Sequence, residues 1–549
     1  MTNNLTTQTR LALIGDLGDE VGAKIFLFTY INAIFWLHIT LKIESERIGN
    51  KKTMKLYMAI AAAIISLLLM LSPPAYAEPV TQEEPQPKPN ILLILTDNTG
   101  WGDWGVYGGG SLRGAPSPHI DRLATEGTRL LNANTEAQCT PSRSALLTGR
   151  HAIRSGTQSI PLGTPLYGLI PWETTLAESL SDVGYATGAF GKWHLGRSTG
   201  RWPTDQGFDE WYGIPNSTDE SVWLTPETIS RYSIAGDVNI ADSNKPWIFE
   251  SYKGKQPQPQ KIYDLNERRL IDGELTQRAI AFMTRNHEAG KPFFAYIPYT
   301  AMHYPTLPHP DFAGKSGHGD YADMLVQTDY YVGQLLDAIA KLGIEKNTIV
   351  IFTADNGVED STVGDGQYSG WSGPWAGTYF TAMEGGLRVP FIIRWPDKIP
   401  AGKVTNEIVH EVDIFPTLAS LTGAKVPSDR AVDGINMADF FLGKNPKSGR
   451  EGFVVFVADD LRAVKWHDWK LHYAWQETKT SHIARYSTVA KLVDLTRDPH
   501  ESRQVSEPYN TWIQYPMVQL VSDYNSSLQK YPNVPVGAPN SYTPKRTNR

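Results

Sequence analysis

The chain has 549 residues, 41% of them hydrophobic, and a formal net charge of −7. A chain of this length can bury a large core and is longer than most single domains, so two domains are the starting expectation. Charges of both signs are mixed along the sequence without a basic stripe, which argues against nucleic acid as a partner.

The N-terminal region contains the pattern of an export signal. A basic segment at 51–55 precedes an apolar run at 56–71, and an Ala-Tyr-Ala sequence at 75–77 fits a cleavage site. We therefore predict a signal peptide at 54–77 and export, either to the periplasm or to the medium. A Pro-rich polar linker is predicted at 78–89.

Residues 1–53 lie ahead of this signal and include a second apolar run at 25–41. That run is at the short end for a membrane span, and a signal peptide has no purpose in the middle of a chain. We predict that translation begins at Met54 and that residues 1–53 are absent from the mature protein. A genuine N-terminal extension that anchors the protein in a membrane is the alternative.

The first predicted strand, at 91–95, is apolar on both faces, as is typical of a buried parallel strand. Asp97 and Asn98 follow it, and a later apolar strand is followed by Asp355 and Asn356. Open α/β sheets place their ligands beyond the carboxyl ends of the strands. These oxygen-bearing side chains suit Ca²⁺ or Mg²⁺. An Asp-Asn pair taken alone is more often an Asx-turn or a helix cap.

The only cysteine, Cys139, begins the sequence Cys-Thr-Pro-Ser-Arg. Pro141 suits the first turn of a helix and Gly149 suits its C-terminal end. Cys139 and Arg143 then share one face at the N-terminal end of that helix, where unpaired N–H groups favour an anion. A lone thiol in an exported protein has no intramolecular disulfide partner. We interpret the pair as a nucleophile beside an anion-binding arginine; a buried structural cysteine is the alternative.

Two further apolar strands are also followed by polar side chains. The strand at 186–190 precedes Lys192 and His194, which point to the same side if the chain remains extended. The strand at 293–297 precedes His303, and prolines on either side fix the path of the chain around it. We predict that all three side chains join the site. A polar pair on a loop and a structural histidine are the alternatives.

Helical patterns at 118–126 and 321–342 alternate with the strands, and each is followed by glycine. This alternation predicts an α/β fold with a covered sheet, which we assign to a catalytic domain at 90–450. Beyond it the pattern changes to short alternating pieces such as 463–473, which favour hairpins. We predict a smaller C-terminal α+β subdomain at 451–549.

Together these motifs resemble the type I, formylglycine-dependent sulfatases of the alkaline phosphatase superfamily, with an arylsulfatase-like pattern. The resemblance includes the Cys-x-Pro-x-Arg helix and the segments at 95–103, 384–390 and 492–499, in matching order and spacing. It implies a large, mixed, mostly parallel sheet sandwiched by helices. It also implies a sulfuric ester hydrolase whose cysteine is converted to 3-oxoalanine (formylglycine) by a formylglycine-generating or an anaerobic sulfatase-maturing enzyme.

The resemblance also implies roles for the predicted site residues. A divalent metal, usually Ca²⁺ and alternatively Mg²⁺, would be held by Asp97, Asn98, Asp355 and Asn356 with residue 139. The substrate, a sulfated small molecule or carbohydrate, would have its sulfate surrounded by Cys139 in its converted form, Arg143, Lys192, His194 and His303. Glu384 and Arg388 would form a charge pair beneath the site.

The expected mechanism begins with the hydrated aldehyde at residue 139, one hydroxyl of which attacks sulfur after Asp355 removes its proton. The metal, Arg143 and Lys192 would stabilise the charge that develops on the sulfuryl oxygens. His303 would protonate the leaving alcohol. His194 would then remove the proton from the second hydroxyl, so that sulfate leaves and the aldehyde re-forms.

The chain departs from the family pattern at two positions. Most members carry a second Asp where this chain has Asn98, so the metal pocket is one charge less acidic here. Many members carry a lysine five residues before the Glu of Glu-Gly-Gly, where it donates to the sulfate and the leaving group. Tyr379 occupies that position in this chain. One cation is therefore missing or is supplied from elsewhere.

Two other functions fit parts of the pattern. A phosphoester or phosphonate ester hydrolase could use the same plan of side chains, and a degenerate protein that binds sulfated glycans could keep the pocket without turnover. The intact Cys139-x-Pro-x-Arg143 sequence argues against a pure binding protein. The aromatic residues between 217 and 261 either cover the entrance of the site or pack in the core.

Overall fold

The computed structural model describes residues 87–160, 166–221, 246–359, 370–486, 490–505 and 511–545, with a few isolated residues between 55 and 63. The predicted extension at 1–53 lies outside the described residues, as do nearly all of the predicted signal peptide and most of the linker. Within the described part of the chain, no helix is both long and apolar enough to cross a membrane.

A mixed sheet of eleven strands forms the centre of the described structure. Its middle consists of four parallel strands in the spatial order β8 (Thr348–Ala354), β1 (Asn90–Thr96), β7 (Phe293–Pro298) and β3 (Ala186–Phe190). Every residue of these strands is buried, which explains why each is apolar on both faces. They are the four strands predicted from the sequence.

The outer strands make the sheet mixed. On the β8 side, β9 (Arg388–Arg394) runs antiparallel to both β8 and β2 (Thr128–Asn134), and the short strands β10 (Lys403–Thr405) and β11 (Val409–His410) pair with β2 in parallel. On the β3 side, β4 (Glu210–Gly213) is parallel to β3, and β5 (Trp247–Tyr252) and β6 (Gln258–Ile262) follow as antiparallel strands. The predicted mixed, mostly parallel sheet is confirmed.

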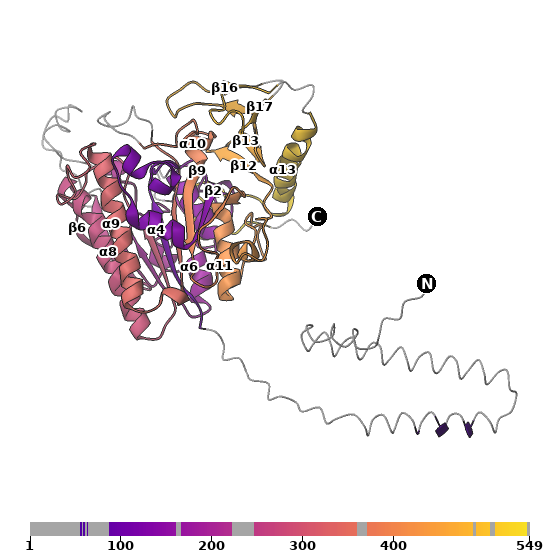
Figure 1. Cartoon of the computed structure of the whole chain (residues 1–549), viewed down its shortest axis with the longest axis horizontal. Coiled ribbons are helices and arrows are strands. Elements are labelled where there is room, and N and C mark those ends of the chain that lie inside the picture. Colours follow the sequence, from indigo (N-terminus) through magenta and orange to yellow (C-terminus); the bar gives the residue numbers. More distant parts are fainter. Residues whose placement is uncertain are drawn as a thin grey trace, which may run out of the picture. The chain divides into compact units, whose positions relative to one another are not determined.

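Helices cover both faces of this sheet (Figure 1). On one face lie α4 (Pro118–Glu126), α8 (Leu265–Glu288) and α9 (Asp320–Lys341), and on the other lie α5 (Cys139–Thr148), α6 (Leu176–Ser181), α11 (Ile414–Thr422) and α12 (Ala438–Phe441). Leu92 and Ile94 of β1 point into the first core, whereas Ile91, Leu93 and Leu95 point into the second. The sandwich predicted for the catalytic domain is therefore present.

A smaller antiparallel sheet follows the main sheet in the chain. Its order is β12 (Gly452–Val457), β13 (Asp460–Trp466), β14 (Trp469–His472) and β17 (Lys491–Asp494), and helix α13 (Thr511–Lys530) packs on one face. The hairpin expected within 463–473 is the β13–β14 pair. A separate two-stranded hairpin joins β15 (Ala474–Trp475) to β16 (Ala484–Arg485).

Buried charges join this C-terminal subdomain to the main sheet. Glu384, at the start of α10 (Glu384–Leu387), contacts Arg388 and Lys465 at 2.6 Å each and Lys470 at 2.9 Å. Burial alone would raise the pKa of Glu384, but these three cations hold it well below its usual range. The predicted Glu384–Arg388 pair is thus part of a buried ion-pair network, and the two lysines of that network come from β13 and β14.

Candidate active site

The parallel register of the central strands brings two acidic side chains together. Thr96 of β1 lies opposite Ala354 of β8, so Asp97 and Asp355 are the next residues on adjacent strands. Arg143 spans the pair, because its Nη2 donates to Oδ2 of Asp97 at 3.0 Å and to Oδ2 of Asp355 at 2.7 Å. All three side chains are fully buried.

Helix α5 supplies both Arg143 and the single cysteine. The helix begins at Cys139 and is followed by Gly149 in the left-handed conformation (φ 68°), as the sequence predicts. Every residue of α5 is buried. Arg143 also donates through Nη1 to the backbone carbonyl of Lys192 at 2.7 Å. The guanidinium therefore positions two carboxylates and the loop after β3 around the start of the helix.

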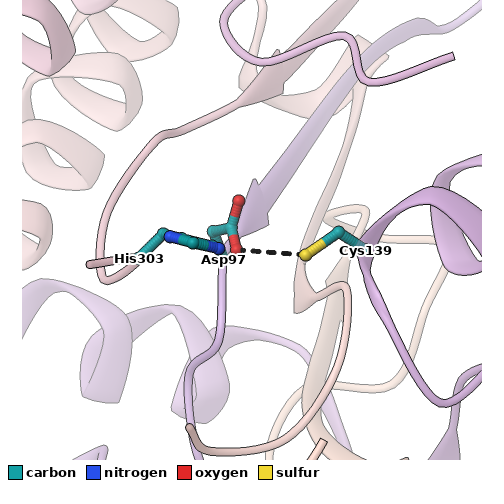
Figure 2. Close-up of side chains that lie close together, drawn as sticks. All are labelled: Asp97, Cys139 and His303. Carbon is teal, nitrogen blue, oxygen red and sulfur yellow. Dashed lines mark hydrogen bonds between the residues drawn. The ribbon is translucent and has the colours of Figure 1, made fainter. Parts of the chain in front are cut away.

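Figure 2 shows the thiol of Cys139 directed at the carboxylate of Asp97. The Sγ atom lies 3.6 Å from Oδ1 of Asp97 and 3.9 Å from Oδ1 of Asn98. Burial, together with the negative charge of Asp97, raises the pKa of this thiol well above its usual value. A neutral thiol is a poor nucleophile.

Lys192 forms the second cationic contact of Asp97. Its Nζ donates to Oδ2 of Asp97 at 2.6 Å and to Oγ of Ser217 at 3.1 Å. Burial opposes ionisation of both acids, but Lys192, His303 and Arg143 outweigh it at Asp97 and hold the pKa of that carboxyl below its usual range. At Asp355 burial and the charge of Asp97 dominate and raise the pKa. The two neighbouring carboxyls are thereby separated into a stable anion and a better proton acceptor.

His194 lies in the segment after β3, where its φ of 59° shows that the chain does not remain extended as the sequence analysis assumed. Its Nε2 is 2.7 Å from Oε1 of Glu220, whereas its Nδ1 is buried and has no hydrogen-bond partner among the described residues. Burial lowers the pKa of His194, and Glu220 only partly opposes that shift. The ring is therefore neutral at neutral pH: Nε2–H donates to Glu220 and the lone pair of Nδ1 is available.

His303 reaches the same pocket from the loop after β7. Its Nδ1 lies 2.8 Å from the carbonyl oxygen of Tyr304, which can only accept, so Nδ1 carries a proton. Its Nε2 lies 3.1 Å from Oγ of Ser217 and 3.6 Å from Oδ1 of Asp219. Ligand atoms of Asp97, Cys139 and His303 all lie within 4.8 Å of one another (Figure 2).

The oxygen atoms around Cys139 fit a hard divalent cation. Asp97 and Asn98 each direct a side-chain oxygen at the sulfur. Asn356 donates to Oδ1 of Asn98 at 2.7 Å, while its own Oδ1 is buried without a partner in the described structure. Asp355 accepts the N–H of Asn98 at 3.2 Å. A buried amide oxygen without a donor, beside carboxylates and amides, is the donor set that Ca²⁺ or Mg²⁺ takes.

The structure also brings in residues that the sequence analysis did not single out. Ser217 and Glu220 contact Lys192 and His194 from a short turn after β4, and Glu359 accepts from Asn98 Nδ2 at 3.4 Å. Lys479 donates to the hydroxyl of Tyr379 at 2.7 Å. No spacing or motif marks these residues, because each lies outside the strand ends that carry the pattern.

A cavity of about 760 Å³ adjoins this pocket. Ser217 and Glu220 line it together with Trp202, Trp247 and Phe249. Part of the aromatic segment predicted to cover the entrance, residues 222–245, lies outside the described residues. In the part that is described, Trp247 and Phe249 are only half-buried, so they contribute to the cavity wall as well as to the packing around β5.

Comparisons with known proteins identify the family. The family model described as Sulfatase matches residues 89–424, and the one described as N-sulphoglucosamine sulphohydrolase, C-terminal, matches residues 379–526. The chain belongs to the sulfatase family. Its predicted activity, hydrolysis of sulfuric esters, is that of the family, and the predicted family membership is confirmed.

Several relatives in this family are similar over most of their length. Steryl-sulfatase of Mus musculus is 32% identical, covering 82% of this chain and 83% of the relative, and N-acetylgalactosamine-6-sulfatase of Canis lupus familiaris is 34% identical, covering 76% and 81%. The crystal structure of the sulfatase PsFucS1 from Pseudoalteromonas sp. is 32% identical, with a TM-score of 0.75, and covers 82% of this chain and 92% of that one. The sulfatase fold is therefore confirmed as well.

The neutral state of His194 gives this sulfatase a testable pH dependence. The pKa of His194 is lowered from the ordinary 6.5, and His194 is predicted to act in the release of sulfate, after the alcohol has left. We therefore expect kcat for a sulfate ester to fall as the pH drops below that value and His194 takes up a proton. Glu220→Gln removes the charge that raises the pKa and should move this acid limb to lower pH. Steady-state pH profiles of the wild-type enzyme and of Glu220→Gln measure the position of the acid limb in each.

Glu407→Gln is the matched control for this experiment, because Glu407 pairs with the exposed Lys447 at 2.9 Å and contacts none of the site residues. The pH profile of Glu407→Gln should match that of the wild-type enzyme. An acid limb that stays in place, or moves to higher pH, in Glu220→Gln would contradict the assignment of His194 as the titrating base.

Proposed function

We propose that this sulfatase is exported and hydrolyses sulfate monoesters with a formylglycine at residue 139 and a bound Ca²⁺. The observation that carries the proposal is the state of Cys139. Its thiol is buried, its pKa is raised, and it faces Asp97, yet it begins a helix whose Arg143 and neighbouring Lys192 are charged. A hydrated aldehyde at this position supplies a hydroxyl nucleophile and a second hydroxyl for the release of sulfate.

In this proposal the two acidic residues, Asp97 and Asp355, have different roles. Asp97 stays charged beside Lys192 and Arg143, so it anchors the cations and offers Oδ1 as a metal ligand. Asp355 has the raised pKa and is the better acceptor for the proton of the attacking hydroxyl. A bound Ca²⁺ would be held by Asp97, Asn98, Asp355 and Asn356 and would supply charge for the sulfuryl oxygens.

The two histidines take the remaining proton transfers. His303 holds a proton on Nδ1 against a carbonyl, so a second proton on Nε2 can pass to the leaving alcohol on the side of Ser217 and Asp219. His194 offers the unpaired Nδ1 lone pair and accepts the proton of the second hydroxyl. In this proposal the acid and the base therefore come from the ends of two separate strands, β7 and β3.

For the substrate we propose a sulfated small molecule or carbohydrate whose alcohol part occupies the cavity beside Ser217 and Glu220. The half-buried Trp247 and Phe249 offer flat apolar faces that suit a sugar ring or an aryl group. The relatives carry names that refer to a sterol and to an amino sugar. A panel of aryl sulfates and defined sulfated oligosaccharides, with the matching phosphates, tests this part of the proposal; faster turnover of the phosphates would make the protein a phosphoester hydrolase.

Conversion of Cys139 is the first prediction from this proposal. We expect active protein, produced with a formylglycine-generating or anaerobic sulfatase-maturing enzyme, to contain formylglycine at residue 139. Cys139→Ala and Cys139→Ser should lose multiple turnover, because neither side chain can form the hydrated aldehyde. Peptide mass analysis combined with turnover assays measures both. Full activity from protein that contains only the unmodified thiol would refute the mechanism.

Metal binding gives a second prediction, centred on Asn98. Asp97→Asn should weaken Ca²⁺ binding by at least about 10-fold, as loss of a tuned ligand usually does. Asn98→Asp restores the carboxylate common in the family, but it places that charge near Glu359, whose Oε2 now accepts from Asn98 at 3.4 Å. We therefore expect Glu359→Gln to weaken Ca²⁺ binding, because it removes a nearby negative charge, and Asn98→Asp combined with Glu359→Gln to bind Ca²⁺ more tightly than Glu359→Gln alone, as measured by calorimetric titration.

Equal Ca²⁺ affinity in Glu359→Gln and in the double variant would show that Glu359 does not compensate for Asn98. Undiminished turnover by protein shown to be metal-free by elemental analysis would contradict the metal site itself.

Export is the last element of the proposal and rests on the signal pattern at 54–77. Cleavage after Ala77 should leave Glu78 at the N-terminus of the mature protein. N-terminal sequencing of protein from the native host measures this, and a mature form that retains residues 1–53 would favour a membrane anchor instead.

A further inference from the structure

The C-terminal subdomain places a lysine beside the pocket of the nucleophile. Lys479 lies in the loop of the β15–β16 hairpin, and its side chain is only 17% exposed although lysine is usually a surface residue. Its Nζ donates to the hydroxyl of Tyr379 at 2.7 Å, lies 4.5 Å from the centre of that ring, and is 3.4 Å from Oε1 of Glu359.

Tyr379 and Glu359 connect this lysine to the reacting centre. Tyr379 is 5% exposed and donates its hydroxyl to Oε1 of Glu359 at 3.2 Å. The other oxygen of Glu359 accepts from Nδ2 of Asn98, whose Oδ1 lies 3.9 Å from the sulfur of Cys139. Burial raises the pKa of Tyr379, and the negative charge of Glu359 adds to this effect, so the phenol stays protonated.

Backbone contacts fix both ends of this arrangement. The N–H of Tyr379 donates to the carbonyl of Val358 at 3.0 Å, and the next residue, Phe380, donates to the carbonyl of Ala137 at 2.7 Å, two residues before Cys139. On the other side, the N–H of Lys479 donates to Oγ1 of Thr378 at 3.3 Å, and its carbonyl accepts from Gln476 at 3.2 Å. The lysine is thus held by its own backbone as well as by its side chain.

We propose that Lys479, positioned by the hydroxyl of Tyr379, forms a second cationic clamp for the sulfate group of the substrate and that the C-terminal subdomain supplies it to the active site. This inference rests on the proposed function of the same site. An ammonium has three N–H donors, and among the described residues Tyr379 and Glu359 take two of them, which leaves one for an anion. Glu359 balances the charge of Lys479 until the substrate binds, and the ring of Tyr379 stabilises the ammonium group through a cation–π contact.

The proposal accounts for the tyrosine at a position where many relatives carry lysine. A lysine at residue 379 and Lys479 would bring two ammonium groups to the same place. In this chain a cation one hundred residues further along the sequence lies against Tyr379 instead, because Lys479 donates to its hydroxyl at 2.7 Å. Lys192 and Lys479 then approach the pocket from β3 and from the C-terminal hairpin respectively, and each is paired with one carboxylate.

The test uses the converted, Ca²⁺-loaded full chain. Lys479→Ala should lower kcat/KM for an aryl sulfate by about 100-fold, the usual effect of removing one donor to a developing anion. It should also weaken the binding of inorganic sulfate, measured by calorimetric titration without turnover. Lys479→Arg should retain most of both. Lys530→Ala is the matched control, because Lys530 also lies over a tyrosine ring in this subdomain but on the exposed end of α13.

Rescue separates a clamp from a purely structural contact. Tyr379→Lys in the Lys479→Ala background restores a cation at the same place and should recover sulfate binding and most of kcat/KM. The proposal would be overturned if this double variant recovered neither sulfate binding nor kcat/KM while its melting temperature and Ca²⁺ binding matched those of the wild-type enzyme. Unchanged sulfate binding in Lys479→Ala would also overturn it.

These outcomes differ from a failure of the proposed function. If the wild-type chain, with Cys139 converted to formylglycine, does not hydrolyse sulfate esters, the proposed function is wrong whatever the variants do. The sulfate titration then still decides whether Lys479 binds the anion.

Discussion

The fully buried guanidinium of Arg143 is the interaction on which the site depends. It donates to Asp97, to Asp355 and to the carbonyl of Lys192, so one side chain ties together the ends of β1, β8 and β3 and the start of α5. Removing one partner from a buried charge network typically costs about 3–5 kcal/mol, whereas an exposed pair contributes about 1 kcal/mol or less. Arg143 therefore fixes the geometry of the carboxylates at least as much as it serves an anion.

The central strands and the groups that follow them could be predicted from the sequence because their signal is local. Buried parallel strands are apolar on both faces, and the residues after each strand lie at one edge of the sheet. The pairing of Thr96 with Ala354 then brings Asp97 beside Asp355, two residues far apart in the chain. The helix from Cys139 to Thr148 was likewise predictable, since proline and glycine mark its two ends.

The other residues of the site could not be predicted, because they lie in turns and loops, where no hydrophobic periodicity or motif indicates their position. Glu220 and Ser217 lie in a short turn, and their roles depend on where the loops after β3 and β7 happen to meet. Lys479 is in a loop of a two-stranded hairpin and reaches Tyr379 only through tertiary packing. A sequence can indicate that a cation is missing at Tyr379. It cannot indicate which distant lysine lies there.

If Cys139 is converted to formylglycine as proposed, the burial of α5 sets the order of conversion and folding. Cys139 is 3% exposed, and every other residue of its helix, which packs against η8 (Glu411–Asp413) and α11, is also buried. A maturing enzyme must enclose the segment around residue 139 in its own active site, which the folded protein does not permit. If this cysteine is converted, conversion has to take place on the nascent or newly translocated chain. Folding then seals the finished residue inside, and a chain that folds too early remains permanently unconverted.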